Sequence, residues 1–233
     1  MFVAHYAPAL AVAALTRRPR LGPLFLAAQL LDIAFFLLVL AGVEKLGIAP
    51  GITTMSPLDI WDARWTHSLV GTLGWAAGFT LAVKLLTRDA RAAWIGGAVV
   101  ASHWPLDLIA HAPDLTIAGA GARYGWGLWN HPFIAMPLEL LATFLAFAFY
   151  WNRTRAADWR GRWAAGLLAA VMLAFQLYAW LAPQPTEPAM HAPAALSINA
   201  LAAYTILTVL AWWTGDLRER RGRPLDRTVA EAA

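Results

Sequence analysis

The chain of 233 residues is 60% hydrophobic and 14% charged, and its apolar residues form long runs separated by short loops rich in Arg, Gly and Pro. This composition is typical of an integral membrane protein and argues against a soluble domain. The net charge of +4 does not indicate a nucleic-acid partner, because the basic residues lie between the apolar runs. Since the chain has no cysteine, any metal site must use His, Asp and Glu.

The apolar runs predict an all-α, polytopic bundle of transmembrane helices. A run of roughly 20 apolar residues is needed to cross a bilayer as a helix. We expect a shorter apolar helix at 2–15 and six full spans near 22–43, 66–86, 92–112, 132–151, 163–181 and 195–213. The runs lack the alternation of a transmembrane β-barrel strand. The sequence therefore predicts one membrane domain over residues 1–215 and a charged tail at 216–233.

The basic residues predict how this bundle lies in the membrane. Of the 18 Lys and Arg, only Lys45, Arg64 and Arg123 fall in loops on one side, and the others fall on the opposite side with the Arg-rich tail. The side that carries more Lys and Arg faces the cytoplasm under the positive-inside rule. The sequence therefore predicts a multi-pass protein of the cytoplasmic (inner) membrane whose C-terminus is cytoplasmic.

The predicted outer loop that begins at Glu44 contains a helix-start signal. Ser56 has the residue type of an N-cap, Pro57 suits the first helical position, and Asp59 is an acid in the first turn. We expect a helix to begin there. It either lies along the outer surface or runs directly into the span that contains His67.

Several ionisable side chains fall within or at the ends of the predicted spans. Each of them needs a partner, a water-filled cavity or a metal ion to offset the cost of leaving water. They are His5, Asp32, His67, His103, Asp107, His111 and Glu139. The last two spans contain no such group, so we expect these helices to act as scaffold.

His103 and Asp107 have the spacing of paired ligands. Four residues correspond to about one helical turn, so both side chains project from the same face. Pro105 lies between them and is expected to loosen or kink the helix and to free a backbone carbonyl. His111 continues the same stripe, but it lies at the predicted membrane boundary, as His131 does. We therefore expect water to solvate both of these histidines and leave them outside the site.

The depth of the polar residues indicates one shared cavity. Counting about 1.5 Å per helical residue places His67, Asp107, Glu139, His103 and Asp32 in the outer half of the membrane. His5 joins them if the first helix runs outward from its C-terminal end. Since nearly every Arg is predicted on the cytoplasmic side, carboxylates in this cavity favour a bound metal ion or bound protons.

A metal ion in such a cavity would be held by imidazole nitrogens and carboxylate oxygens. These ligands suit Zn²⁺ best, with Mn²⁺ and Fe²⁺ as alternatives. The candidate ligands are His5, Asp32, His67, His103 and Asp107. The candidate catalytic residues are Asp32, as a ligand or a general base, and Glu139, as an acceptor that would hold the second nitrogen of a ligating imidazole.

Two short motifs resemble those of the membrane-bound metal-dependent hydrolases of the YdjM type. They are Trp65-Thr66-His67-Ser68 and, about 35 residues later, Ser102-His103-Trp104-Pro105-Leu106-Asp107. His5 and Asp32 also fit the pattern, and the resemblance covers about the first half of the chain. It implies a membrane-embedded hydrolase that depends on a divalent metal.

The chain departs from that family at one position. The usual His-Arg pair ahead of Thr-His-Ser would fall on Asp62 and Ala63, and Arg64 lies one place further on. Asp62 could still ligate a metal, but the family's catalytic residues do not all carry over.

Three functions are compatible with these residues. The first is a metal-dependent hydrolase whose site opens to the outer side and acts on a lipid-like ester or phosphoester. The second is a transporter or permease coupled to protons or metal ions, which would need polar groups continuing toward the cytoplasm. The third is a structural membrane protein whose polar cluster only joins helices. The inner half of the bundle offers few polar groups, which favours a blind site and hence the hydrolase.

Overall fold

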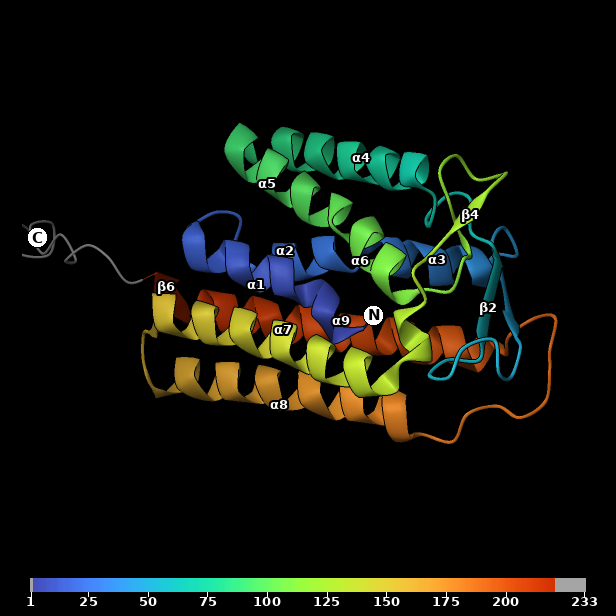
Figure 1. Cartoon of the computed structure of the whole chain (residues 1–233). Helices are drawn as coiled ribbons and strands as arrows, with labels where there is room; N and C mark the ends of the chain where they lie inside the picture. Colours follow the sequence, from blue (N-terminus) through green and yellow to red (C-terminus); the bar gives the residue numbers. More distant parts are fainter. Residues whose placement is uncertain (1, 221–233) are drawn as a thin grey trace, which may run out of the picture.

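The computed structural model describes residues 2–220, and helices that run side by side make up most of it (Figure 1). In the first half these are η1 (Val3–His5), α1 (Tyr6–Leu15), α2 (Leu21–Ala28), α3 (Leu30–Leu40), α4 (Leu69–Thr87), α5 (Ala90–Ala101) and α6 (His103–Ala110). The second half contains η2 (Leu128–Asn130), α7 (Pro132–Arg153), α8 (Trp159–Leu181) and α9 (Ala194–Asp216). Helices suit these apolar runs because a helix satisfies its own backbone groups without water.

Four of the helices are long and apolar enough to cross a membrane, namely α4, α7, α8 and α9. The helices α2 and α3 meet this criterion together, but they are bent by 51° where they join. The N-terminal apolar helix is shorter, as the sequence predicts. Several apolar helices therefore indicate a membrane protein. Six full spans are not confirmed, because the described residues contain four single helices and one bent pair that could cross a membrane.

The remaining predicted span, at 92–112, is divided into α5 of 12 residues and α6 of 8 residues. Pro105 explains the break, because it lacks the amide hydrogen that would bond the Ala101 carbonyl and its ring crowds that carbonyl. The Ser102 hydroxyl lies at the break and donates to the Val99 carbonyl over 2.7 Å. The kink expected from Pro105 is thus present, and a single straight helix over this range is not.

Small residues allow the helices to approach closely. A Cβ atom at Gly22 would lie 2.7 Å from the Trp212 Cα atom, so α2 can pack on α9 only because this position is glycine. The main core lies between α1, α2, α8 and α9, where Tyr6, Leu10 and Phe25 are fully buried. The first helices therefore lie inside the bundle and not at its edge.

Short antiparallel strands occupy the loops. They pair as β1 (Lys45–Ile48) with β2 (Leu58–Asp62), β3 (Leu115–Thr116) with β4 (Arg123–Tyr124), and β5 (Thr154–Ala156) with β6 (Arg218–Arg220). The helix expected at Ser56 is therefore wrong, because the chain enters β2 at that point. The Ser56 hydroxyl accepts from the Leu58 amide over 3.3 Å. Pairing in a strand lets Leu46 and Ile60 pack against α3, which outweighs the local helix-start signal.

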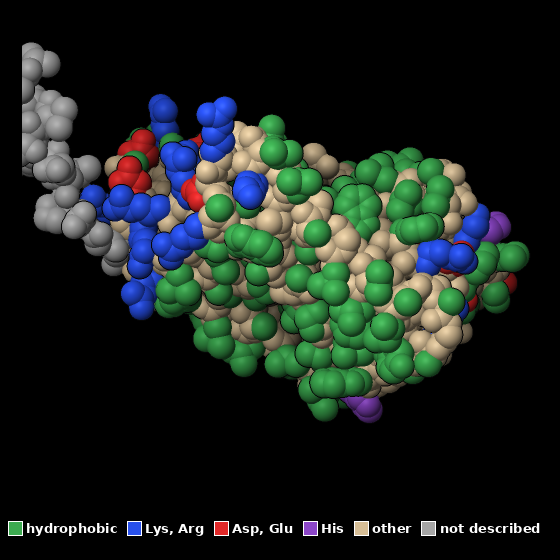
Figure 2. Space-filling view, turned by 90° about the horizontal axis from the view of Figure 1, so that it is seen from above, with side chains coloured by type: hydrophobic (Ala, Val, Ile, Leu, Met, Phe, Trp, Pro, Cys, Tyr) green, Lys and Arg blue, Asp and Glu red, His purple; other side chains and the backbone are tan. Residues whose placement is uncertain are grey.

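The loops divide between two ends of the bundle (Figure 1). The connections α1–α2, α4–α5 and α7–α8 lie at one end together with β6, and β1 to β4 lie at the other. Figure 2 shows Lys and Arg gathered at the first end, which we call the basic end, and mostly hydrophobic side chains between the ends. The strand β6 shows that part of the predicted charged tail is structured, and residues 221–233 of that tail lie outside the described residues.

Candidate metal centre

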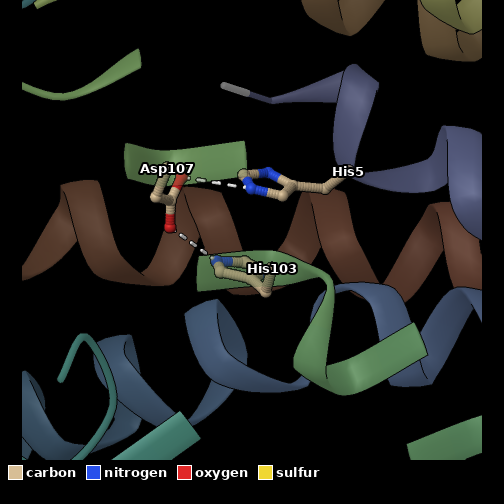
Figure 3. A group of neighbouring side chains, drawn as sticks. All are labelled: His5, His103 and Asp107. Atoms are coloured by element: carbon tan, nitrogen blue, oxygen red, sulfur yellow. Dashed lines mark ion pairs between the residues drawn. The ribbon is translucent and has the colours of Figure 1, made fainter. Parts of the chain in front are cut away.

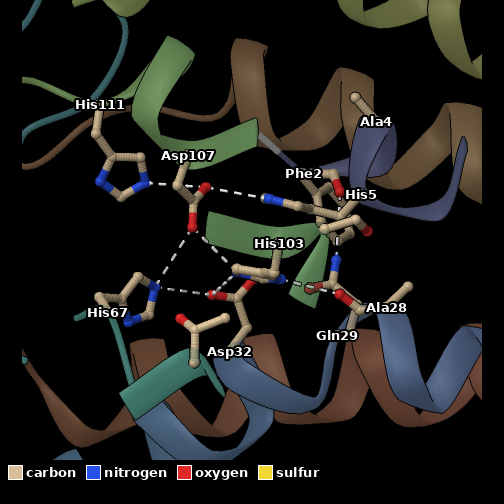
Figure 4. Close-up of polar contacts among 12 residues, drawn as sticks. Phe2, Ala4, His5, Ala28, Gln29, Asp32, His67, His103, Asp107 and His111 are labelled. Carbon is tan, nitrogen blue, oxygen red and sulfur yellow. Dashed lines mark hydrogen bonds and ion pairs between the residues drawn. The ribbon is translucent and has the colours of Figure 1, made fainter. Parts of the chain in front are cut away.

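Histidine and aspartate side chains from four parts of the chain converge in the interior (Figures 3 and 4). His5 ends η1, Asp32 lies on α3, and His67 precedes α4. The short helix α6 supplies His103 and Asp107 one turn apart, as their spacing predicts. The structure thus brings together the five candidate ligands, in two overlapping groups of three that could hold a metal ion: His5, His103 and Asp107, and Asp32, His67 and His103.

Four ligand atoms form a closed ring. His67 Nε2 lies 3.4 Å from Asp32 Oδ1, and Asp32 Oδ1 lies 3.5 Å from His103 Nε2. His103 Nε2 lies 3.1 Å from Asp107 Oδ2, which lies 3.8 Å from His67 Nε2. Ligands at about 2.0–2.1 Å from a tetrahedral zinc ion stand roughly 3.3 Å apart. Neighbouring atoms of the ring therefore have the spacing of ligands of one ion, and Asp32, His67 and His103 lie close enough together to hold it.

His5 approaches the opposite oxygen of the same carboxylate. Its Nε2 atom lies 3.1 Å from Asp107 Oδ1, and its ring stacks on His103 with 3.9 Å between centroids and 7° between planes (Figure 3). Two protonated imidazoles would repel strongly at this separation in a buried site. The stacking therefore favours at least one neutral ring, which is the form that binds a metal ion.

Hydrogen bonding fixes the orientation of His103. Its Nδ1 atom lies 2.9 Å from the Ala28 carbonyl oxygen, which can only accept, so Nδ1 carries the hydrogen. The neutral ring then presents the Nε2 lone pair to Asp107. A hydrogen bond behind the ligating ring is the usual arrangement of a metal-bound histidine.

His67 is held in the same way through a buried relay. The Thr66 hydroxyl donates to Glu44 Oε2 over 2.7 Å, because a carboxylate can only accept. That hydroxyl lies 2.9 Å from His67 Nδ1 and must therefore accept from it. Glu44 also accepts from the backbone amides of Trp65 and Thr66. The relay directs the His67 Nε2 atom toward the two aspartates.

A substitution at Thr66 tests whether the relay from Glu44 through Thr66 orients His67. Changing Thr66 to Val removes the acceptor behind His67 with little change in volume, so we expect metal affinity to fall by about 10- to 100-fold. Titration with Zn²⁺ in competition with a chelating dye measures this affinity. Thr66→Ser keeps the hydroxyl and is expected to bind as tightly as wild type. Equal affinity in the Val and Ser variants would show that the relay does not orient His67.

His111 is the residue that sequence reasoning left out wrongly. It is buried, with 4% of its surface exposed, because the loop that carries Trp129 covers it and the two rings lie 4.4 Å apart. Its Nε2 atom lies 3.3 Å from Asp107 Oδ1, and its Nδ1 atom lies 3.1 Å from Asp114 Oδ1. The same four-residue stripe that linked His103 to Asp107 was the signal for it. His131, by contrast, is exposed, as expected.

Glu139 does not lie behind an imidazole. It accepts hydrogen bonds from the backbone amides of Phe2 and Ala4, while Gln176 accepts from the Val3 amide over 3.1 Å. Gln29 donates to the Phe2 carbonyl over 3.2 Å. The buried polar side chains of α7, α8 and the α2–α3 junction therefore hold the segment before His5, and Glu139 serves a different contact from the one expected.

Two further residues lie outside the centre. Asp62 and Arg64 form a two-point ion pair with distances of 2.9 and 3.0 Å at the loop end. The hydrogen bonds that the exposed Arg64 guanidinium donates to this carboxylate raise the pKa of Arg64. Asp62 is thus occupied at the surface and contributes no ligand to the described cluster.

The donor set fits a divalent cation. Three imidazoles, those of His67, His103 and His111, have an acceptor at Nδ1 and direct Nε2 toward carboxylate oxygens. A lone pair facing a carboxylate at 3.1–3.8 Å is repulsive unless a proton or a metal ion lies between them. Protonating every ring would place several positive charges within a few ångströms of one another in an apolar interior. A metal ion satisfies the same atoms without that repulsion.

Access to the centre is narrow. Asp32 retains 15% of its side-chain surface, whereas His5, His103 and Asp107 are almost completely buried. Tyr204 on α9 donates to Asp32 Oδ2 over 3.3 Å and so holds the second carboxylate oxygen. Asp32 is therefore the member of the cluster that solvent or a substrate can approach most easily.

Comparison with known proteins finds no matching family, no matching curated protein and no matching solved structure for this chain.

Proposed function

We propose that this protein is a membrane-embedded, metal-dependent hydrolase that acts on a lipid-like ester or phosphoester. The observation that carries the proposal is the convergence of imidazole Nε2 atoms on Asp32 and Asp107 while acceptors hold their Nδ1 atoms. This arrangement is typical of metal ligands and their outer partners. It also agrees with the resemblance of the two motifs to the YdjM-type hydrolases.

The chain supplies the groups that such chemistry needs. A bound divalent ion would polarise an ester or phosphoryl oxygen and would lower the pKa of a bound water toward about 7. His67, His103 and Asp107 would hold the ion. Asp32, the most accessible member, would ligate it or accept the proton of the attacking water. The buried surroundings exclude bulk water and strengthen these electrostatic interactions.

An apolar groove supports a lipid-like substrate. It has a volume of about 960 Å³ and lies between α3, which carries Asp32, and α4, which follows His67. Its lining residues are Leu30, Leu38, Val43, Arg64, Trp65, Ser68, Val70, Gly71, Gly74, Trp75, Gly78, Phe79, Ala82 and Ala118. An acyl chain would fit this surface, and its lining residues Trp65 and Ser68 flank Thr66 and His67 in the chain.

A transport function receives less support. A proton or ion pathway would need polar groups that are free to exchange partners along the bundle. The hydroxyls of Thr80 and Thr143 instead donate to carbonyls of their own helices, at 2.8 Å each, and the Thr72 hydroxyl donates to the Thr66 carbonyl.

The charge distribution further leads us to propose the cytoplasmic membrane as the location, with the basic end on the cytoplasmic side.

Ester hydrolysis by the purified protein tests the proposal. We expect detergent-purified wild type loaded with Zn²⁺ or Mn²⁺ to hydrolyse long-chain carboxylic or phosphate esters, to lose activity with a chelator, and to regain it when metal returns. His103→Ala should be inactive, and Asp62→Asn, outside the centre, should remain active. Failure of metal-loaded wild type to hydrolyse any of these ester classes would contradict the proposal, as would full activity in His103→Ala.

A further inference from the structure

The cluster contains more ligand groups than one ion can use. A tetrahedral site accepts four ligands, and a catalytic site keeps one of these positions open. The ring of Asp32, His67, His103 and Asp107 Oδ2 already provides four. His5, His111 and the Oδ1 atom of Asp107 remain, and all of them lie in the interior.

The two oxygens of Asp107 face different histidines (Figure 4). Oδ2 lies near His103 and His67, and Oδ1 lies 3.1 Å from His5 Nε2 and 3.3 Å from His111 Nε2. An ion held in the ring would contact Oδ2 and leave the Oδ1 side to these other two rings. A carboxylate that meets imidazole nitrogens through both oxygens has the arrangement of a bridging ligand.

The orientation of His111 suits a cation on the Oδ1 side. Asp114 can only accept, so the hydrogen on the His111 ring lies on Nδ1, 3.1 Å from Asp114 Oδ1. Neutral His111 then directs its Nε2 lone pair at Asp107 Oδ1, 3.3 Å away, and these two atoms repel unless a proton or a metal ion lies between them. Asp114 behind His111 repeats the carboxylate–histidine–metal arrangement of known metal sites.

We propose that the centre binds a second divalent ion on the Oδ1 side of Asp107, held by His111 and His5, so that Asp107 bridges two ions. This inference rests on the proposed function and makes it more specific. Two-metal sites with ions roughly 3.5–4 Å apart stabilise both the attacking and the leaving oxygen of an in-line displacement. A second ion therefore favours phosphoesters over carboxylic esters as the substrate class.

The number of ions per chain tests this inference with Zn²⁺ alone as the probe. We expect elemental analysis of Zn²⁺-loaded, desalted wild type to give about two ions per chain and His111→Ala to give about one. His131→Ala, which changes an exposed histidine, should keep two. Asp114→Asn leaves His111 in place and should lower the affinity for one of the two ions by about 10- to 100-fold.

The outcomes separate the second ion from the hydrolase itself. One ion in both wild type and His111→Ala would overturn the second site and leave a single-ion hydrolase intact. No ion in wild type would overturn both proposals. Loading with Mn²⁺ gives a further measurement that does not depend on the variants, because neighbouring Mn²⁺ ions couple magnetically. We expect a coupled paramagnetic resonance signal from wild type, and a spectrum of isolated Mn²⁺ alone would contradict the bridge.

Discussion

Replacing Asp107 with Asn is expected to abolish metal binding and hydrolysis in a protein that still folds. Asp107 lies within 3.8 Å of the Nε2 atoms of His5, His67, His103 and His111, and Asn keeps its shape while removing its charge. Loss of an outer partner commonly costs about 10- to 100-fold in metal affinity or activity, so loss of this shared ligand should exceed that range. Metal content and initial rates measure the effect.

Thermal unfolding supplies the control for Asp107→Asn. A ligand that binds only the folded state stabilises it, by about 2.7 kcal/mol when its concentration is 100 times Kd. A chelator should therefore lower the melting temperature of wild type and leave that of Asp107→Asn unchanged. Asp62→Asn should respond to the chelator as wild type does, because Asp62 pairs with Arg64 at the surface. Metal content in Asp107→Asn equal to that of wild type would contradict the site.

Replacing Glu139 with Leu is expected to destabilise the protein and to reduce its metal content. The change leaves the buried Ala4 amide and the partly buried Phe2 amide without their acceptor, and an unpaired donor costs about 1–3 kcal/mol when it is buried. It also releases the segment that positions His5. Chemical denaturation measures the stability, and elemental analysis measures the metal.

Glu139→Gln is the matched variant, because its amide oxygen can still accept from both amides. We expect it to retain metal and most of the stability of wild type. If Glu139→Gln kept its metal and its fold but lost hydrolysis, Glu139 would take part in proton transfer, and the anchoring role would be insufficient.

Run length and apolarity were enough to predict the long helices. The helices α4, α7, α8 and α9 each have the length and apolarity of a membrane span. They can therefore be predicted without knowing which helices pack against them. The bend between α2 and α3 and the strand at Leu58 depend on packing against other parts of the chain. Burial of Ile60 in the strand outweighs the local preference for a helix at Ser56. A local sequence pattern does not show how deeply Ile60 will be buried.

The sequence predicted five members of the cluster but not His111 or Glu44, because the contacts of these two residues depend on how distant parts of the chain pack. The spacing of His103 and Asp107 follows from helix geometry, and the cost of burying polar groups suggested that His5, Asp32 and His67 join them. His111 was assigned to solvent because it lies at the predicted membrane boundary, whereas the loop bearing Trp129 folds back over it. Glu44 lies outside every predicted span, so its contact with His67 through Thr66 becomes visible only in three dimensions.

The metal content of the purified protein shows whether the buried His and Asp cluster is a metal centre. Wild type prepared without chelator should be compared with the double variant His103→Ala, Asp107→Ala by elemental analysis, with thermal stability recorded for both. We expect Zn, Mn or Fe at one or more ions per chain in wild type and almost none in a double variant that remains folded. Wild type without metal, or equal metal in both proteins, would contradict a metal centre and would leave the polar cluster as a set of contacts between helices.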